Sequence, residues 1–312
     1  MSGLRVVYMG TPAFAVPCLD RLVADGYELA AVVTQPDRPK GRGQKLSPSP
    51  VKEAAIGHGL TVLQPEKIKT ADFLAELTVL KPDVVVVVAF GQFLPKAILE
   101  LPPFGCVNVH ASLLPRYRGA APIHWAVMNG ETATGVTTMY MDAGMDTGDM
   151  ILKAELPIGP DETTGQLHDR LSALGAEVLA ATLARVAAGT APRQPQDNAA
   201  ATYAPLLTRA VERLDWQSAA TAVHNKVRGL NPWPGAYCLH QGRPLKVWAS
   251  TPVPTTAGGK AGEMLAASDA GVVVACGSGA LRLTEVQPEN RRRMGAGEYA
   301  RGYGLTAGEL LE

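Results

Sequence analysis

The stretch that decides the fold is Asp83–Ala89, DVVVVVA, which holds five consecutive valines. Valine is branched at Cβ, so it loses rotamer freedom in a helix and packs well in a strand. The run is too short to cross a membrane, and it lacks the polar alternation of a strand with one solvated face. It therefore predicts a strand that is buried on both faces.

Toward the N-terminus, short apolar runs alternate with helical patterns. Strands are predicted at Leu4–Met9 and Leu29–Thr34, and the stretch between them has apolar residues at helical spacing and stops at Gly26. A helix is predicted over Thr70–Leu80, and Ser49 followed by Pro50 is typical of a helix start.

Toward the C-terminus, the alternation continues with strands predicted at Cys106–His110 and Gly135–Met141. A long amphipathic helix is predicted from Thr164 to Ala188, with Gly189 as its C-cap. Strands that alternate with helices indicate an α/β fold, in which a doubly wound, Rossmann-like sheet is mostly parallel.

A change of character follows this first domain, which we place at residues 1–189. Residues 190–208 are rich in Ala, Pro and Gln and show no sustained period, so we expect a linker. Beyond it, at 209–312, short strands and glycine-containing turns predict a small β-rich domain, a barrel or a sandwich. Its predicted strands are Leu245–Ala249, Val272–Ala275 and Leu281–Val286.

The composition is that of an ordinary globular protein. Of the 312 residues, 46% are hydrophobic and 19% are charged, which excludes disordered and low-complexity classes. The formal net charge of zero argues against a nucleic-acid partner, but the charge is unevenly distributed. Residues 209–312 hold 12 Lys and Arg against 9 Asp and Glu, whereas residues 1–208 hold 17 against 20. Zero net charge is therefore compatible with a partner held at local cationic sites.

Cysteine usage and the N-terminus indicate the cellular compartment. The four cysteines lie far apart with no C-x-x-C pair, so neither a disulfide framework nor a structural metal is expected. The chain starts with MSGLRVVYMG, which enters a predicted strand without the basic and apolar regions of a signal peptide. We expect a cytoplasmic protein with reduced thiols.

Candidate catalytic residues lie in Gly105–Pro122, which reads GCVNVHASLLPRYRGAAP. In a strand, Asn108 and His110 point to the same face, and both lie at its carboxyl end, where open α/β sheets bind ligands. An amide donor beside an imidazole can polarise a carbonyl and hold an oxyanion. A histidine at a strand end is, however, as often a structural residue as a catalytic one.

A second polar cluster, MDAGMDTGD, occupies Met141–Asp149. Its two glycines permit backbone conformations closed to other residues and the close approach of a ligand. A carboxylate from this cluster would orient His110 and favour its protonated form. The alternative is that these aspartates only shape a solvated turn, and the residues alone leave both interpretations open.

The two segments together resemble the signature of the folate-dependent formyltransferases. NVHASLLPRYRGAAPI is followed by DAGMDTGDM, which begins 32 residues after the histidine. Further matching stretches, among them MGTPAFAVPCL, TQPDRPKGRGQKLSPSPVK and NPWPGAY, are similar to the members of this family that formylate methionyl initiator tRNA. This narrower resemblance extends along nearly the whole chain.

The resemblance implies a direct formyl transfer without a metal. It implies 10-formyltetrahydrofolate as the formyl donor and co-substrate, and the free α-amine of methionyl initiator tRNA as the acceptor. Asn108 and His110 would contact the formyl oxygen, and Asp146 would pair with His110. Amine attack would pass through a tetrahedral oxyanion and give N-formylmethionyl-tRNA for translation initiation, on an enzyme that we expect to be a monomer. The implied folate contacts are Ser112, Leu113, Leu114 and Pro115.

The resemblance also implies two contacts with the tRNA. The basic segment Arg38–Lys45 would approach the acceptor end, with Arg42 and Lys45 as contact residues, although Gln44 stands where a lysine is common. The C-terminal domain would be an OB-like barrel that grips the backbone of the tRNA, with Arg291, Arg292 and Arg293 as its densest cationic run. Leu206 and Leu207 replace a more polar linker, which puts a contact there in doubt.

Three other functions compete with this one. The turn after the first strand would suit the phosphate loop of a dinucleotide-dependent dehydrogenase, but the G-x-G-x-x-G fingerprint is absent. The same catalytic residues could serve another acceptor, such as an amino sugar, glycinamide ribonucleotide or water. A nucleic-acid-binding module with a degenerate enzyme attached is the third, although all three catalytic positions are filled.

Overall fold

The computed structural model describes residues 3–40, 45–254 and 258–312. The chain divides into two compact units. The first consists of Met1–Gly119, Thr134–Leu156 and His168–Tyr203, and the second of Ala120–Ala133, Pro157–Leu167 and Ala204–Glu312. The units interleave along the chain, and the domain boundaries expected from composition, at 189 and 209, stay a prediction.

The first unit is built on a sheet of seven strands in the order β5-β2-β1-β6-β7-β8-β9. Pairing is parallel from β5 through to β7, and β8 is antiparallel to β7. The predicted α/β class with a mostly parallel sheet is confirmed. The strands are β1 (Arg5–Gly10), β2 (Glu28–Val33), β5 (Val62–Leu63), β6 (Val84–Val88), β7 (Cys106–His110), β8 (Ala133–Tyr140) and β9 (Met150–Pro157).

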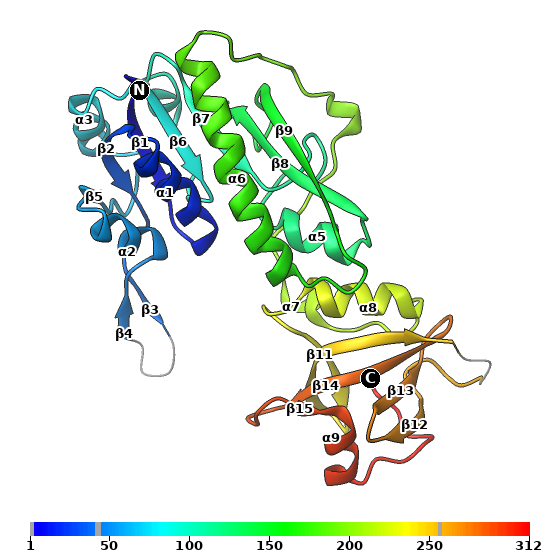
Figure 1. The fold of residues 1–312 in the computed structure, drawn as a ribbon. Helices are drawn as coiled ribbons and strands as arrows, with labels where there is room; N and C mark the ends of the chain where they lie inside the picture. Colours follow the sequence, from blue (N-terminus) through cyan, green and yellow to red (C-terminus); the bar gives the residue numbers. More distant parts are fainter. Residues whose placement is uncertain (1–2, 41–44, 255–257) are drawn as a thin grey trace. The chain divides into compact units, whose positions relative to one another are not determined.

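The valine run forms β6, and all five of its side chains are buried. On one face, Val85 and Val87 belong to an apolar cluster with Phe73 of α3 (Ala71–Val79) and Ile98 of α4 (Lys96–Leu99). The helices α1 (Val16–Ala24) and α6 (Thr164–Ala187) lie on the other face of the sheet (Figure 1).

Close packing brings α6 against the sheet at Gly175. A Cβ at this position would lie 3.3 Å from Val109 of β7 and 3.8 Å from the Cys18 sulfur of α1. Because side chains alternate along a strand, Asn108 and His110 lie on the face of β7 that is turned away from α6.

Helix ends follow the predicted signals. The Ser49 hydroxyl accepts a hydrogen bond of 3.0 Å from Lys52 N and caps α2 (Pro50–Gly57). Thr70 caps α3 in the same way. After α6, Gly189 has φ +67°, a left-handed conformation that favours glycine, as predicted for a C-cap.

The basic segment at 38–45 begins and ends in a small antiparallel ribbon. Its strands, β3 (Arg38–Lys40) and β4 (Lys45–Ser47), pair Arg38 with Ser47 and Lys40 with Lys45. The sequence predicted a loop here, because three-residue strands are too short to show a period. The short 3-10 helices of this unit are Ala13–Ala15 and Asn198–Ala200.

The second unit holds an antiparallel sheet in the order β10-β11-β14-β13-β12, with β15 paired to β14. Val247, Leu281 and Leu283 from the sheet and Val223 and Tyr299 from helices share one buried core. The elements are α5 (Pro122–Met128), α7 (Arg209–Glu212), α8 (Ala220–Gly229), β10 (Ala236–His240), β11 (Arg243–Val253), β12 (Met264–Ser268), β13 (Gly271–Ala275), β14 (Ala280–Pro288), β15 (Met294–Gly295) and α9 (Ala296–Tyr303).

The end of the chain joins the two edges of this sheet. Leu239 of β10 and Glu312 exchange two backbone hydrogen bonds, of 2.7 and 2.8 Å. Leu311 N donates to Gly262 O, beside the start of β12, at 2.8 Å. This closure is consistent with the predicted small barrel, since closing a sheet satisfies its edge groups.

Within the parts of the chain that the structure describes, no helix is long and apolar enough to span a membrane.

Candidate active site

The site begins at the end of β7, the strand that carries Asn108 and His110. β7 lies between β6 and β8, so both of its edges are paired. Asn108 is 8% exposed and His110 is 6% exposed. The two polar side chains are thus almost fully buried. An electrostatic interaction with a substrate is stronger in such a buried site than in solvent.

Both ring nitrogens of His110 face acceptors. Nε2 lies 3.0 Å from the Tyr117 carbonyl oxygen, and since a carbonyl only accepts, Nε2 donates in this contact. Nδ1 lies 3.7 Å from Asp146 Oδ2, an ion-pair distance that is too long for a hydrogen bond. A protonated ring would have a donor directed at each of these oxygens.

Asp146 owes its position to its backbone and to one amide. Its φ of +55° is left-handed, which is uncommon for a residue other than glycine. Its Oδ2, the oxygen that faces His110, accepts a hydrogen bond of 2.8 Å from Gly119 N. This oxygen therefore joins the loop after β8 to the segment after β7.

The neighbouring Asp142 makes its hydrogen bonds within its own turn instead. Its Oδ1 accepts from Gly144 N at 2.9 Å and from the Thr147 hydroxyl at 2.6 Å, so it shapes the turn. Gly148 closes the turn, because a Cβ there would collide with the Tyr140 carbonyl oxygen. The two interpretations of the cluster thus apply to different aspartates: Asp142 stabilises the turn, and Asp146 faces the histidine.

The first part of the predicted folate stretch is fixed by internal hydrogen bonds. Ser112 is fully buried, and its hydroxyl donates to Arg116 O at 2.6 Å. Its carbonyl oxygen accepts from the Thr137 hydroxyl of β8 at 2.7 Å. The Ser112 side chain is therefore used within the protein.

The second part of the stretch alternates in exposure. Leu114 is 1% exposed and packs with Met139 and Met150, whereas Leu113 and Pro115 are half-buried. The backbone and the half-buried side chains are the parts of this stretch that a ligand can reach.

A lysine that the sequence did not indicate also supports this stretch. Lys153 of β9 donates from Nζ to Leu114 O at 2.5 Å. Desolvation by burial lowers the pKa of Lys153. Alternation along β9 gave no reason to distinguish this lysine from an ordinary solvated one.

The structure describes only part of the basic segment 38–45. Arg42, a predicted tRNA contact, lies outside the described residues. Lys45 is the first residue of β4, and its backbone pairs with Lys40, but its side chain is not among those that the structure describes.

Arg291, Arg292 and Arg293 are exposed in the second unit. Arg292 pairs with Glu298 at 2.8 Å, and the Arg293 guanidinium lies 3.5 Å from the centre of the Trp248 ring. Exposed ion pairs contribute only about 0–1 kcal/mol, so a phosphate can replace such a partner.

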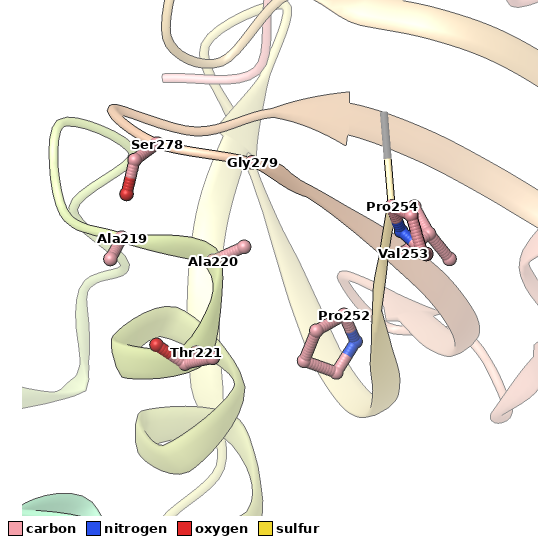
Figure 2. Close-up of a pocket in the computed structure, with 8 residues that line it drawn as sticks. All are labelled: Ala219, Ala220, Thr221, Pro252, Val253, Pro254, Ser278 and Gly279. Atoms are coloured by element: carbon pink, nitrogen blue, oxygen red, sulfur yellow. The ribbon is translucent and has the colours of Figure 1, made fainter. Parts of the chain in front are cut away.

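Figure 2 shows an open hollow elsewhere in the second unit, with a volume of about 410 Å³. Small apolar side chains such as Ala220, Pro252 and Val253 line it, with hydroxyls from Thr221 and Ser278. Its described lining carries no titratable side chain, so it offers no acid–base chemistry. Among residues 3–40, 45–254 and 258–312, no cluster of three or more metal-ligating side chains is found.

Two family models match the chain. One, described as formyl transferase, matches residues 4–183, and the other, formyl transferase C-terminal domain, matches residues 206–304. The chain is 54% identical over 308 residues to the methionyl-tRNA formyltransferase of Moorella thermoacetica, with 99% of each chain covered. It is 52% identical over 311 residues to that of Geobacter metallireducens, covering 100% of this chain and 99% of the relative.

The chain belongs to the methionyl-tRNA formyltransferase family. Membership of this family confirms the resemblance expected from the motifs, and the dehydrogenase interpretation is left without support.

Two solved structures with the same fold are less similar to this chain in sequence than the relatives above. WlaRD, a sugar 3N-formyl transferase studied in the presence of dTDP and 5-N-formyl-THF, has a TM-score of 0.67 at 17% identity, covering 93% of this chain and 99% of that one. HypX from Aquifex aeolicus, in complex with tetrahydrofolic acid, has a TM-score of 0.66 at 17% identity. The match covers 98% of this chain but only 48% of HypX, so this chain spans about half its length.

Proposed function

We propose that this chain transfers the formyl group of 10-formyltetrahydrofolate to the α-amine of methionyl initiator tRNA. The product, N-formylmethionyl-tRNA, serves translation initiation. The proposal is supported by about half-identity, over the full length, to proteins named methionyl-tRNA formyltransferase. The observation that carries it at the level of chemistry is that Asn108 and His110 end β7 while Asp146, in the loop after β8, faces His110.

The reaction forms a bond from the amine nitrogen to the formyl carbon and breaks the bond from that carbon to N10 of the folate. Between these events the formyl oxygen carries negative charge. The Asn108 amide and a protonated His110 are the donors for this charge, and one such donor stabilises an oxyanion by about 3 kcal/mol.

His110 has to exchange one partner to do this. In the structure its Nε2 donates to Tyr117 O at 3.0 Å, and the formyl oxygen would compete with that carbonyl for the same proton. Asp146, held at Oδ2 by Gly119 N, would balance the charge of the ring from the Nδ1 side. The amine loses a proton and N10 gains one, so the reaction is neutral overall.

Folate and tRNA would be held by different parts of the chain. The folate would lie along the stretch 112–115 and contact its backbone and the side chains of Leu113 and Pro115. The buried side chains of Ser112 and Leu114 would hold this stretch in its conformation. Arg42 and Lys45 would contact the acceptor end of the tRNA. The exposed run Arg291–Arg293 would contact the tRNA backbone.

The test offers 10-formyltetrahydrofolate to the full-length protein together with one acceptor at a time. The acceptors are methionyl initiator tRNA, free methionine and an amino sugar nucleotide. We expect rapid formylation of the tRNA-bound methionine alone, on a protein that sediments as a monomer. Equal formylation of free methionine, or preference for the amino sugar, would overturn the proposal.

A further inference from the structure

Residues 194–202, which the sequence predicts to be part of a linker, lie against the segment that follows β7. Arg118 N donates to Thr202 O at 2.9 Å, and Tyr117 N donates to the Thr202 hydroxyl at 2.9 Å. At the other end, Gln194 and Met150 exchange two backbone hydrogen bonds, of 2.8 and 3.0 Å. All of these residues belong to the first compact unit. The segment is therefore part of the framework around the candidate active site.

The side chain of Gln196 uses all of its hydrogen-bonding groups in one place. Its Nε2 donates to Asp146 O at 2.8 Å and to Gly148 O at 2.9 Å. Its Oε1 accepts from Arg118 Nε at 3.0 Å and from Arg118 Nη2 at 2.8 Å. A guanidinium only donates and a carbonyl only accepts, so these partners determine which way the amide points.

Arg118 is itself held firmly. It is 2% exposed, and its Nη2 also donates to Asn198 Oδ1 at 2.9 Å. A planar guanidinium with two bonds to one amide oxygen leaves that oxygen little freedom to move. Gln196 is thus an oriented bridge between a buried arginine and the backbone of the loop 141–149.

The bridge ends on a residue whose backbone conformation needs support. Asp146 has a left-handed φ of +55°, and the surrounding structure has to maintain such a conformation in a non-glycine residue. Gln196 holds its carbonyl oxygen, while Gly119, the residue next to Arg118, holds its carboxylate. Residues 194–202 and the segment 117–119, which are hydrogen-bonded to each other, therefore support the backbone and the side chain of Asp146.

We infer that Gln196, oriented by Arg118, is a positioning residue that keeps the Asp146 carboxylate directed at His110. This inference rests on the role proposed for Asp146. Gln196 does not touch the reacting atoms; it acts through the two carbonyl oxygens that it binds. A misplacement of about 1 Å in a catalytic group can cost on the order of 10²-fold in rate.

Gln196→Glu is the sharpest test, because it separates positioning from stability. The glutamate carboxylate still accepts hydrogen bonds from Arg118, and its negative charge lies beside the positive guanidinium. It lacks the two N–H donors that Gln196 directs at the carbonyl oxygens of Asp146 and Gly148. We expect kcat to fall on the order of 10²-fold with the KM for both substrates unchanged, and the melting temperature to be retained. Gln194→Glu, the same change at an exposed position two residues away, is the matched control and should leave kcat unchanged.

A double-mutant cycle distinguishes failure of this inference from failure of the proposed function. If Gln196 acts through Asp146, Gln196→Glu should cost much less in an Asp146→Asn background than in the wild type. Multiplicative losses, or a Gln196→Glu enzyme as active as Gln194→Glu, would overturn the positioning role while leaving Asp146 catalytic. Retained activity in Asp146→Asn alone would overturn the proposed site and this inference with it.

Discussion

Two buried histidines lie beside an aspartate, one in each compact unit. His110 is 6% exposed and its Nδ1 lies 3.7 Å from Asp146 Oδ2. His224 is 7% exposed and its Nε2 lies 3.2 Å from Asp161 Oδ1. By burial and by distance to a carboxylate the two are alike, and His224 even has the closer partner.

Their surroundings separate them. His110 ends a strand, shares its face with Asn108, and faces a carboxylate that is only 17% exposed. His224 lies within α8, its Nδ1 contacts the Ser250 hydroxyl at 3.1 Å, and its partner Asp161 is 77% exposed. Burial lowers the pKa of His224 more than Asp161 raises it, which favours a neutral ring. A buried histidine next to a carboxylate is thus not enough to indicate catalysis; the carboxylate must itself be fixed and sheltered.

The strongest way to break the site around His110 is to remove its neighbour on the strand. Asn108→Ala deletes one of the two donors proposed for the oxyanion, and we expect kcat to fall about 10²–10³-fold. The measurement is single-turnover formylation of methionyl initiator tRNA. A loss confined to the KM for the folate would instead assign Asn108 to binding.

The fixed position of Asp146 can be disturbed without changing a polar group. Gly148→Ala places a Cβ against Tyr140 O and has to displace the loop 141–149, so we expect a loss on the order of 10²-fold in kcat. Gly57→Ala is the control, because a Cβ there meets nothing within 4 Å. Equal activity of the two variants would show that the loop geometry does not matter.

We expect His224 to affect the pH dependence of the free energy of unfolding. Its pKa in the folded protein lies below the ordinary 6.5, so the unfolded state binds more protons as the pH falls through 6.5. We expect the free energy of unfolding of the second unit to decline in that range, and the decline to be smaller in His224→Asn. Denaturant titrations between pH 8 and pH 5, roughly the span over which a histidine titrates, provide the measurement. An identical pH dependence in both proteins would contradict the assignment.

The smallest effect is expected at the exposed cations of the second unit. Arg292→Ala removes one proposed phosphate contact, so the salt dependence of tRNA affinity should lose about 0.7–0.9 log units per decade of salt. kcat at saturating tRNA should not change. Arg243→Ala, at an exposed position in β11, is the control, and an equal effect there would mean that only overall charge matters.

The sequence predicted the elements whose signals are local. β6 was predicted because a strand that is buried on both faces shows in its own residues, and the Ser49 cap needs only the residues that follow it. The helix α6 was predicted because 24 residues repeat the period several times.

The elements that were missed depend on distant partners. Residues 194–202 have no period, and their hydrogen bonds go to residues about 80 positions earlier, such as Tyr117 and Arg118. The closure of the barrel by Leu311 and Glu312 is made by backbone groups, which no side-chain pattern reveals. Likewise, the residues alone could not choose between Asp142 and Asp146, because the choice depends on which carboxylate the folded loop directs at His110; only the family resemblance indicated Asp146.

The comparison depends on the proposal that His110, unlike His224, takes part in formyl transfer. The direct measurement compares His110→Ala and His224→Ala in single-turnover formylation of methionyl initiator tRNA, at a temperature where both variants are folded. We predict that His110→Ala loses about 10²–10⁴-fold in rate while His224→Ala keeps the wild-type rate. A near-normal rate in His110→Ala, or equal losses in the two variants, would contradict the catalytic role proposed for His110.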